Sequence, residues 1–382
     1  MDKIETTVAP KASGRNYGID LLRLISMLMV VTLHVLGQGG VLKNVAGLTL
    51  QGEAFWALEI TCYGAVNIYA IISGYVGNRA RHKYSNLISL CLQLTFYAII
   101  ITTAEIIIAQ INSIPITFET IFWHLLPSAK GYWYFSAYFC LFFFMPLLNE
   151  VVNRVSRRKL QVAGILVFMV FCFWTQYNDY ISALKAGYSV FWLAILYVLG
   201  AYIAKYDPLK KMSALKCFIG YFLCIAITVL SRICIGEWLS NILGVNFFVS
   251  YTSPTILLSA FFLVCGCSKL QVGKKASKVI SFLAPMSFGV YLIHCHQYTY
   301  GKLYGVFAWL TKEPILLGIL YAIGFALLIF FACLFLDWLR LLIFKAVRMR
   351  KFAEWIEKSV TKITKGILKI FRITLDEEKD KD

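Results

Sequence analysis

Apolar runs of about 20 residues recur along almost the whole chain, and they constrain its fold more than any other feature. Of the 382 residues, 59% are hydrophobic and only 15% are charged, and the mean hydropathy is +0.71. Ordinary soluble domains are nearer half apolar and a quarter charged, whereas apolar runs of this length are typical of transmembrane helices. The sequence therefore predicts an all-α integral membrane protein.

About ten such runs can be placed, and we expect them to form one helical bundle. They cover residues 18–38, 55–77, 86–111, 132–150, 160–176, 188–204, 214–235, 248–267, 279–300 and 315–345. This predicts a transmembrane domain over residues 17–345, preceded by a polar N-terminal segment at 1–16. The eleven cysteines lie mostly within the runs and show no CxxC spacing. We therefore expect buried small hydrophobic side chains rather than metal ligands or a disulfide framework.

The net charge of +17 could suggest nucleic acid as a partner, but the placement of the charges along the chain is better explained by membrane topology. With the N-terminus inside, the N-terminal segment and the cytoplasmic loops carry eighteen Lys and Arg, against five in the opposite loops. By the positive-inside rule, this bias predicts that both termini are cytoplasmic. No nucleic-acid partner is expected.

Residues 346–375 are strongly basic and carry apolar residues at steps of three and four. Phe352, Ile356, Val360 and Ile363 exemplify this spacing. The pattern predicts an amphipathic helix, suited to lie on the anionic lipids of the inner leaflet. A solvated helix that only sets the topology fits equally well. We expect the end of the chain, 376–382, to be disordered.

Two ionisable residues, Arg23 and His34, lie eleven positions apart in the first apolar run. Eleven residues are about three helical turns, so both side chains share one face, about 16 Å apart along the axis. Such residues in a membrane helix usually line a functional path. Arg23, nearer the cytoplasm, suits an anionic group such as phosphate, and His34, deeper, suits proton transfer from a hydroxyl. Alternatively, Arg23 extends to the headgroups and pairs with Asp20, while His34 bonds a neighbouring helix.

Five segments resemble, in order, motifs of the membrane acyltransferase-3 family. They are Arg23 followed by ten residues and His34, Ser73-Gly74-Tyr75 within 67–75, the basic loop 78–83, Trp133-Tyr134 within 132–148, and Tyr291-Leu292-Ile293-His294 within 287–294. The resemblance covers residues 17 to about 340. It implies a ten-helix protein of a bacterial cell membrane that moves an acetyl group from cytoplasmic acetyl-CoA to a hydroxyl of a cell-surface or lipid-linked polysaccharide.

The resemblance also implies roles for individual residues. His34 would be the catalytic histidine, and Arg23 would act in catalysis and at the donor site. Arg79, Arg81, Ser73 and Tyr75 would bind acetyl-CoA, whereas Trp133, Tyr134, Tyr291 and His294 would bind the acceptor. No metal is predicted.

Several of these residues also have structural explanations. Arg79 and Arg81 could only set the topology, and Ser73 could only pack helices. Trp133 and Tyr134 could belong to an interfacial aromatic belt. Two other functions also stay open: a small-molecule transporter, for example of serine, because related modules occur fused to serine racemases, and a purely structural membrane subunit.

Overall fold

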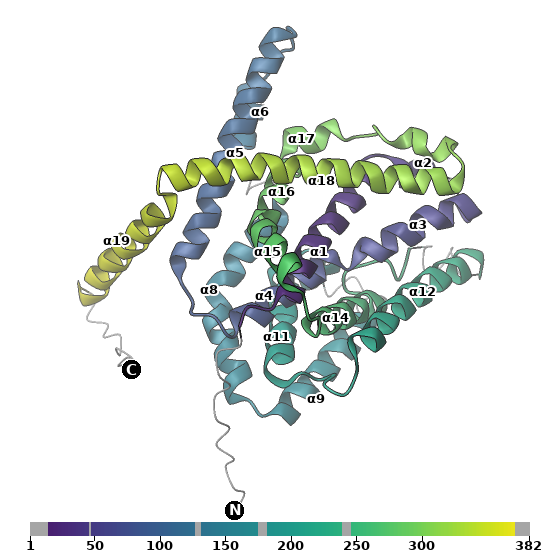
Figure 1. Cartoon of the computed structure of the whole chain (residues 1–382), viewed down its shortest axis with the longest axis horizontal. Coiled ribbons are helices and arrows are strands. Elements are labelled where there is room, and N and C mark those ends of the chain that lie inside the picture. Colours follow the sequence, from purple (N-terminus) through teal and green to yellow (C-terminus); the bar gives the residue numbers. More distant parts are fainter. Residues whose placement is uncertain (1–13, 46, 127–130, 175–181, 239–245, 371–382) are drawn as a thin grey trace, which may run out of the picture.

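The computed structural model describes residues 14–45, 47–126, 131–174, 182–238 and 246–370, and every regular element in these ranges is a helix (Figure 1). The elements are α1 (Tyr17–Leu36), α2 (Val41–Asn44), α3 (Leu50–Tyr63), α4 (Ala65–Gly77), α5 (Tyr84–Ile111), α6 (Phe118–Leu125), α8 (Trp133–Arg154), α9 (Arg157–Val167), η1 (Phe168–Trp174), η2 (Ser182–Gly187), α11 (Val190–Tyr206), α12 (Ala214–Trp238), α14 (Pro254–Ser268), α15 (Lys274–Leu283), η3 (Ala284–Met286), α16 (Ser287–His294), α17 (Gln297–Lys302), η4 (Ala308–Lys312), α18 (Ile315–Ala346) and α19 (Met349–Ile370). The predicted all-α class is therefore confirmed for the described chain.

Seven helical spans of the described chain are long and apolar enough to cross a membrane. They run over Tyr17–Asn44, Leu50–Gly77, Tyr84–Ile111, Trp133–Arg154, Ala214–Gly236, Lys274–His294 and Ile315–Ala346. Two shorter apolar helices, α11 and α14, coincide with the predicted sixth and eighth runs. The predicted fifth run, 160–176, falls on α9 and η1 and continues into residues outside the described ranges. The membrane class is therefore supported, whereas the count of ten stays a prediction.

Two runs predicted as continuous helices are broken in the structure. The run 55–77 is divided at Gly64 into α3 and α4. Gly64 packs against Ser259 of α14, where a Cβ would come within 3.3 Å of the serine hydroxyl oxygen. The run 279–300 is divided between α15 and α16 by η3, which contains Pro285, and it ends at His294. Proline has no backbone N–H and cannot continue the hydrogen-bond ladder.

Hydrogen bonds and an ion pair join the helix ends that the charge pattern assigns to the cytoplasm. Asn16 donates to the carbonyl oxygen of Ser268 at 2.8 Å, and the ammonium of Lys269 lies 3.1 Å from Asp207. At the opposite ends of the helices, Gln51 donates to the carbonyl oxygen of Thr311 at 2.8 Å. The helix ends that the charge pattern assigns to one side of the membrane therefore lie together in the structure. Which side faces the cytoplasm stays a prediction.

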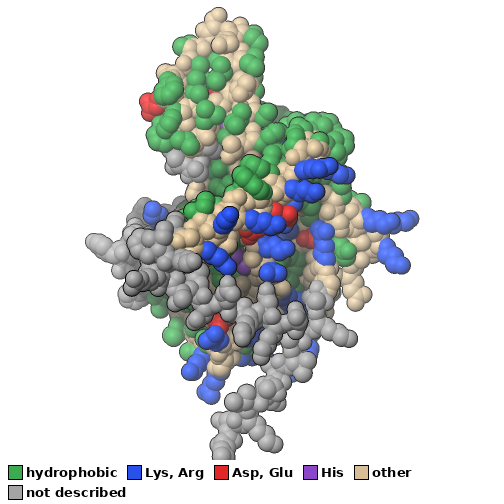
Figure 2. Space-filling model, turned by 90° about the vertical axis from the view of Figure 1, so that its left-hand side faces the viewer, with side chains coloured by type: hydrophobic (Ala, Val, Ile, Leu, Met, Phe, Trp, Pro, Cys, Tyr) green, Lys and Arg blue, Asp and Glu red, His purple; other side chains and the backbone are tan. Residues whose placement is uncertain are grey.

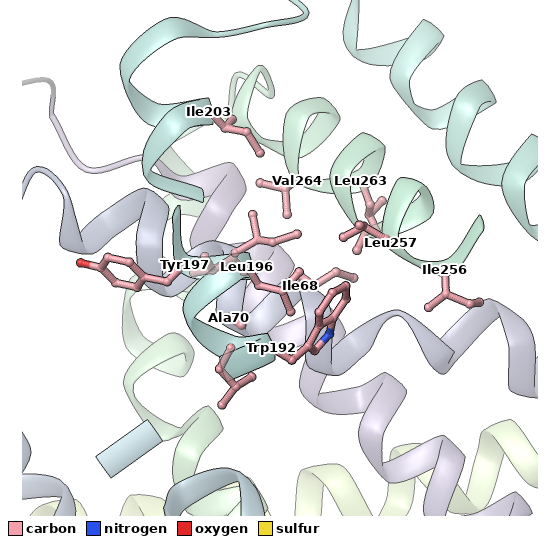
Figure 3. Packing of buried hydrophobic residues seen from close by; sticks show 14 of the residues in the cluster. Ile68, Ala70, Trp192, Leu196, Tyr197, Ile203, Ile256, Leu257, Leu263 and Val264 are labelled. Atoms are coloured by element: carbon pink, nitrogen blue, oxygen red, sulfur yellow. The ribbon is translucent and has the colours of Figure 1, made fainter. Parts of the chain in front are cut away.

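The tightest helix contact is between α4 and α11, where glycine lets the two backbones meet. A Cβ on Gly74 would lie 1.8 Å from the carbonyl oxygen of Tyr197, and one on Gly200 would lie 1.9 Å from that of Ile71. Large buried side chains of α11, among them Trp192, complete this core against α4 and α14 (Figure 3). Such small-residue contacts are common between membrane helices.

The predicted amphipathic helix forms as α19, which begins directly after Arg348, a residue with a φ of 53° in the turn between α18 and α19. Phe352 and Trp355 are 46% and 62% exposed, and Ile363 is 61% exposed. Lys and Arg side chains gather across the middle of one face of the molecule, below the projecting hairpin of α5 and α6 (Figure 2). The predicted disordered tail and most of the N-terminal segment lie outside the described residues.

Candidate functional site

A cavity of about 560 Å³ lies between the helices, and His34 is on its wall. Its other lining residues are Met27, Val30, Leu33, Gly37 and Gln38 from α1 and the turn after it, Glu59, Tyr63, Val66 and Tyr69 from α3 and α4, Gly131, Trp133 and Tyr134 at the start of α8, and Tyr188, Tyr251, Phe288, Tyr291, Cys295 and Tyr300. Cavities of this volume accommodate small organic groups. Aromatic faces together with tyrosine hydroxyls would suit a sugar ring, which has apolar C–H faces and polar edges.

His34 is paired with His294, 260 positions away in the sequence. His34 Nδ1 lies 3.0 Å from His294 Nε2, and His294 Nδ1 lies 2.6 Å from the carbonyl oxygen of Val290. A carbonyl oxygen only accepts, so the hydrogen of a neutral His294 is on Nδ1 and its Nε2 is an acceptor. For a neutral His34, the shared hydrogen is then on Nδ1. Its Nε2 is left with a lone pair and no hydrogen bond within the described chain.

Cys295 completes a three-residue cluster with the two histidines. Its sulfur lies 3.3 Å from His294 Nε2 and 3.7 Å from His34 Nδ1. The three donor atoms all lie within 4.8 Å of one another, and two nitrogens with one sulfur are a set that could hold Zn²⁺ with one open position. The 3.0 Å between the imidazoles is also an ordinary hydrogen-bond distance, so the geometry does not require an ion. The prediction of no metal stays a prediction.

Two further polar groups of the cavity wall are buried without being satisfied by the described residues. Glu59 is 7% exposed, and its Oε2 has no hydrogen-bond partner among the described residues. Tyr291 is 8% exposed, and its hydroxyl donates to no described residue. Buried polar groups in folded proteins are nearly always hydrogen-bonded. These two groups are therefore candidates to contact a bound substrate.

Arg23 lies outside the lining of this cavity, in the ion pair that its alternative explanation predicts. Its guanidinium is 3.2 Å from the carboxylate of Asp20, which also pairs with Arg15 at 2.5 Å. The Arg23 side chain is 28% exposed. The hydroxyl of Tyr69, a cavity residue, donates to the carbonyl oxygen of Arg23 at 2.8 Å. Tyr69 therefore connects the surroundings of Arg23 with the cavity of His34.

The other residues predicted to bind acetyl-CoA also lie outside the cavity lining. Arg79 stacks over the ring of Tyr75, 5.4 Å from its centroid, and donates to the carbonyl oxygen of Ala204. Ser73 donates to the carbonyl oxygen of Tyr69 in its own helix at 2.9 Å. Arg81 is exposed. These contacts agree with the structural explanations, and binding of a coenzyme stays a prediction.

The residues predicted to bind the acceptor are brought together around His34. Trp133, Tyr134 and Tyr291 all line the cavity, and His294 bonds His34 directly. Trp133 also packs against Tyr188, with ring centroids 4.6 Å apart. These positions place the aromatic side chains inside the bundle, where a purely interfacial belt would not put them.

Sequence reasoning did not single out several residues of the cavity. Tyr63, Tyr188, Tyr251 and Tyr300 come from four separate segments, and the ring of Tyr300 meets His34 edge to face at 5.0 Å. No spacing marks them among the 22 tyrosines of the chain. Cys295 stands directly after His294, and this adjacency was the one local signal for it.

The fold and the cavity define an all-helical membrane protein with an internal site of histidine and aromatic side chains. The acyltransferase-3 family, described as an acyltransferase domain, matches residues 16–338, so the chain belongs to that family. Membership implies a membrane acyltransferase, in agreement with the motifs in the sequence, and gives no support to the transporter alternative. Neither a curated protein nor a solved structure matches the chain.

Proposed function

We propose that the protein is a membrane O-acetyltransferase that moves an acetyl group from cytoplasmic acetyl-CoA to a hydroxyl of a cell-surface or lipid-linked polysaccharide. The observation that carries this proposal is the hydrogen-bonded pair of His34 and His294 on the wall of a tyrosine-rich cavity. Family membership supports acyl transfer in general. The acetyl group, the donor and the polysaccharide acceptor are part of the proposal.

His34 acts as the general base in this mechanism. The chain of hydrogen bonds from His34 through His294 to Val290 fixes the His34 tautomer with its lone pair on Nε2. A lone pair fixed in this way can take the proton of an acceptor hydroxyl as it attacks the acetyl carbonyl. His294 is a positioning residue that also stabilises the His34 imidazolium formed in this step, as the orienting member of a catalytic triad does.

The aromatic side chains bind the acceptor and the basic residues bind the donor. Trp133 and Tyr134 stack on the sugar, and the hydroxyl of Tyr291 donates a hydrogen bond to it or to the acetyl carbonyl. Arg23, with Arg79 and Arg81 at the predicted cytoplasmic ends of the helices, holds the phosphates of the coenzyme. The acetyl end then passes the ring of Tyr69 to reach His34.

The test compares polysaccharide from cells that produce the wild-type protein with polysaccharide from cells that produce His34→Ala. Loss of one general base typically lowers the rate about 10²- to 10⁴-fold, so we expect base-labile acetyl groups to disappear from the polysaccharide. The amount of protein in the membrane fraction is measured in the same cells. His124→Gln is the matched control, because His124 pairs with Glu105 at 2.5 Å and does not line the cavity. Unchanged acetylation in His34→Ala would refute the mechanism.

A further inference from the structure

We infer that Cys295 is a catalytic nucleophile that carries the acetyl group as a thioester between the two substrates. This inference deepens the proposed function and rests on it. It assigns to the cluster of His34, His294 and Cys295 two successive half-reactions in place of one direct transfer.

Cys295 differs from the other ten cysteines in its position. All eleven are free thiols, and Cys295 is the cysteine that lines the cavity. It directly follows α16 as its C-cap, where its backbone N–H bonds the carbonyl oxygen of Tyr291. This bond fixes the backbone at the end of the helix and holds the half-buried thiol at the wall of the site.

The neighbours of Cys295 are those that an acyl-accepting thiol requires. A thiol reacts as the thiolate, so it needs a base within hydrogen-bond reach. His294 Nε2, 3.3 Å from the sulfur, is an acceptor because Nδ1 is bound to the carbonyl oxygen of Val290. Nε2 therefore has one lone pair and two hydrogens within reach, that of the Cys295 thiol and that of His34 Nδ1.

The two possible hydrogen bonds of His294 correspond to two half-reactions. When the thiol donates to His294, that imidazole takes its proton as the sulfur attacks the acetyl carbonyl. When His34 donates to His294, the lone pair on His34 Nε2 is set to take a proton from the acceptor hydroxyl. A direct transfer would need only one base, whereas this cluster provides one for the thiol and one for the hydroxyl.

Both steps balance. In the first, the Cys295 sulfur forms a bond to the acetyl carbon, the bond from that carbon to the coenzyme sulfur breaks, and the coenzyme leaves as a thiol with the proton from His294. In the second, the acceptor oxygen bonds the acetyl carbon, the Cys295 sulfur leaves, and the proton taken by His34 passes to that sulfur. One thioester replaces another, and an oxygen ester then forms without any oxidant or reductant.

A second observation points to a carbonyl group bound beside Cys295. The Tyr291 side chain is 8% exposed and lines the cavity, and its hydroxyl has no hydrogen-bond partner in the described chain. A donor held in this way could bond the oxygen of a tetrahedral intermediate. The cavity, at about 560 Å³, is also small for a coenzyme and a polysaccharide together. A covalent intermediate lets the coenzyme leave before the acceptor enters.

The test uses the purified full-length protein in lipid nanodiscs with radiolabelled acetyl-CoA and no acceptor. We expect the wild-type protein to become labelled, neutral hydroxylamine to remove the label, and peptide mass spectrometry to place it on Cys295. Added polysaccharide should discharge the label into its own acetyl esters. Cys295→Ala should take up no label, and its transfer rate should fall at least 100-fold.

Cys91→Ala is the matched control, because Cys91 is also half-buried and does not line the cavity. It should retain both label and transfer. A wild-type protein that acetylates polysaccharide but never becomes labelled overturns the inference, whatever the activity of Cys295→Ala, and leaves the proposed function intact. A label on another residue also overturns it. A wild-type protein that neither releases free coenzyme A nor acetylates polysaccharide instead refutes the proposed function.

Discussion

Gly74 offers the sharpest test of the contact between α4 and α11, which holds the inner part of the bundle together. Replacing Gly74 by alanine would put the new Cβ 1.8 Å from the carbonyl oxygen of Tyr197 and 2.9 Å from its Cα. All three nearest atoms belong to the backbone, so no side-chain rotation can relieve the overlap. An ordinary contact begins near 3.4 Å, so the two helices must separate by about 1.6 Å at this point (3.4 − 1.8) or shift along each other.

The loss in the free energy of unfolding of Gly74→Ala should be near or above the upper end of the range that overpacking of a protein core usually causes. Extra methyl groups in a well-packed interior typically cost about 1 to 3 kcal/mol. Here the partner is rigid backbone, and Gly200 meets the carbonyl oxygen of Ile71 in the same interface, so separation also loosens that contact. We expect a loss of about 3 kcal/mol in the free energy of unfolding, which for a chain of 382 residues corresponds to a Tm lower by about 4 °C.

The assay is thermal unfolding of the purified protein in one detergent, followed by tryptophan fluorescence. Gly324→Ala is the control, because Gly324 lies within the long apolar helix α18 and, apart from the backbone of its own helix, no atom of the described residues lies within 4 Å of the position its Cβ would take. That variant should keep its Tm or gain slightly, since alanine favours a helix over glycine by about 1 kcal/mol. Equal Tm values for wild type and Gly74→Ala would show that α4 and α11 do not meet in this way.

Three further changes test other parts of the structure. Asp337→Ala leaves the guanidinium of Arg340 buried without its carboxylate, which accepts from it at 2.7 and 2.8 Å, so the free energy of unfolding should fall by about 3 to 5 kcal/mol. Thermal unfolding in detergent measures the loss, and additional replacement of Arg340 by methionine should recover most of it. Partial burial opposes ionisation of Glu357, but the backbone at the start of α5 and the positive charge of Lys83 lower its pKa. The ionised carboxylate therefore holds α19 against α5 above pH 4.5, and this contact is lost on acidification. Proteolysis of α19 should rise at low pH in the wild-type protein and should already be high at pH 7 in Glu357→Gln. Protection of Glu357→Gln equal to that of wild type at pH 7 would refute this role. His294→Gln should lower kcat for acetyl transfer 100-fold or more with little change in KM, because the tautomer of His34 is no longer fixed. A change confined to KM would instead assign His294 to acceptor binding.

The sequence predicted those helices whose position depends on a local property of the chain, its hydropathy. The apolar runs fixed α1, α5 and α18 within a few residues, because hydropathy over 20 positions decides whether a segment can lie in a bilayer. The alternation of Lys and Arg predicted which helix ends lie together, and the contact between Lys269 and Asp207 agrees with it. The break at Gly64 was not predicted, because a single glycine inside a helical pattern does not by itself end a helix.

The candidate site was only partly visible in the sequence. Arg23 and His34 share one helical face, and this periodicity follows from the helix alone. The structure then separates them, because Arg23 pairs with Asp20 while His34 is in the cavity wall. The meeting of His34 with His294 and Cys295 depends on how α1 packs against α16, 260 positions later. Hydropathy and charge determine which segments enter a membrane, whereas the contacts between helix faces determine which side chains meet there.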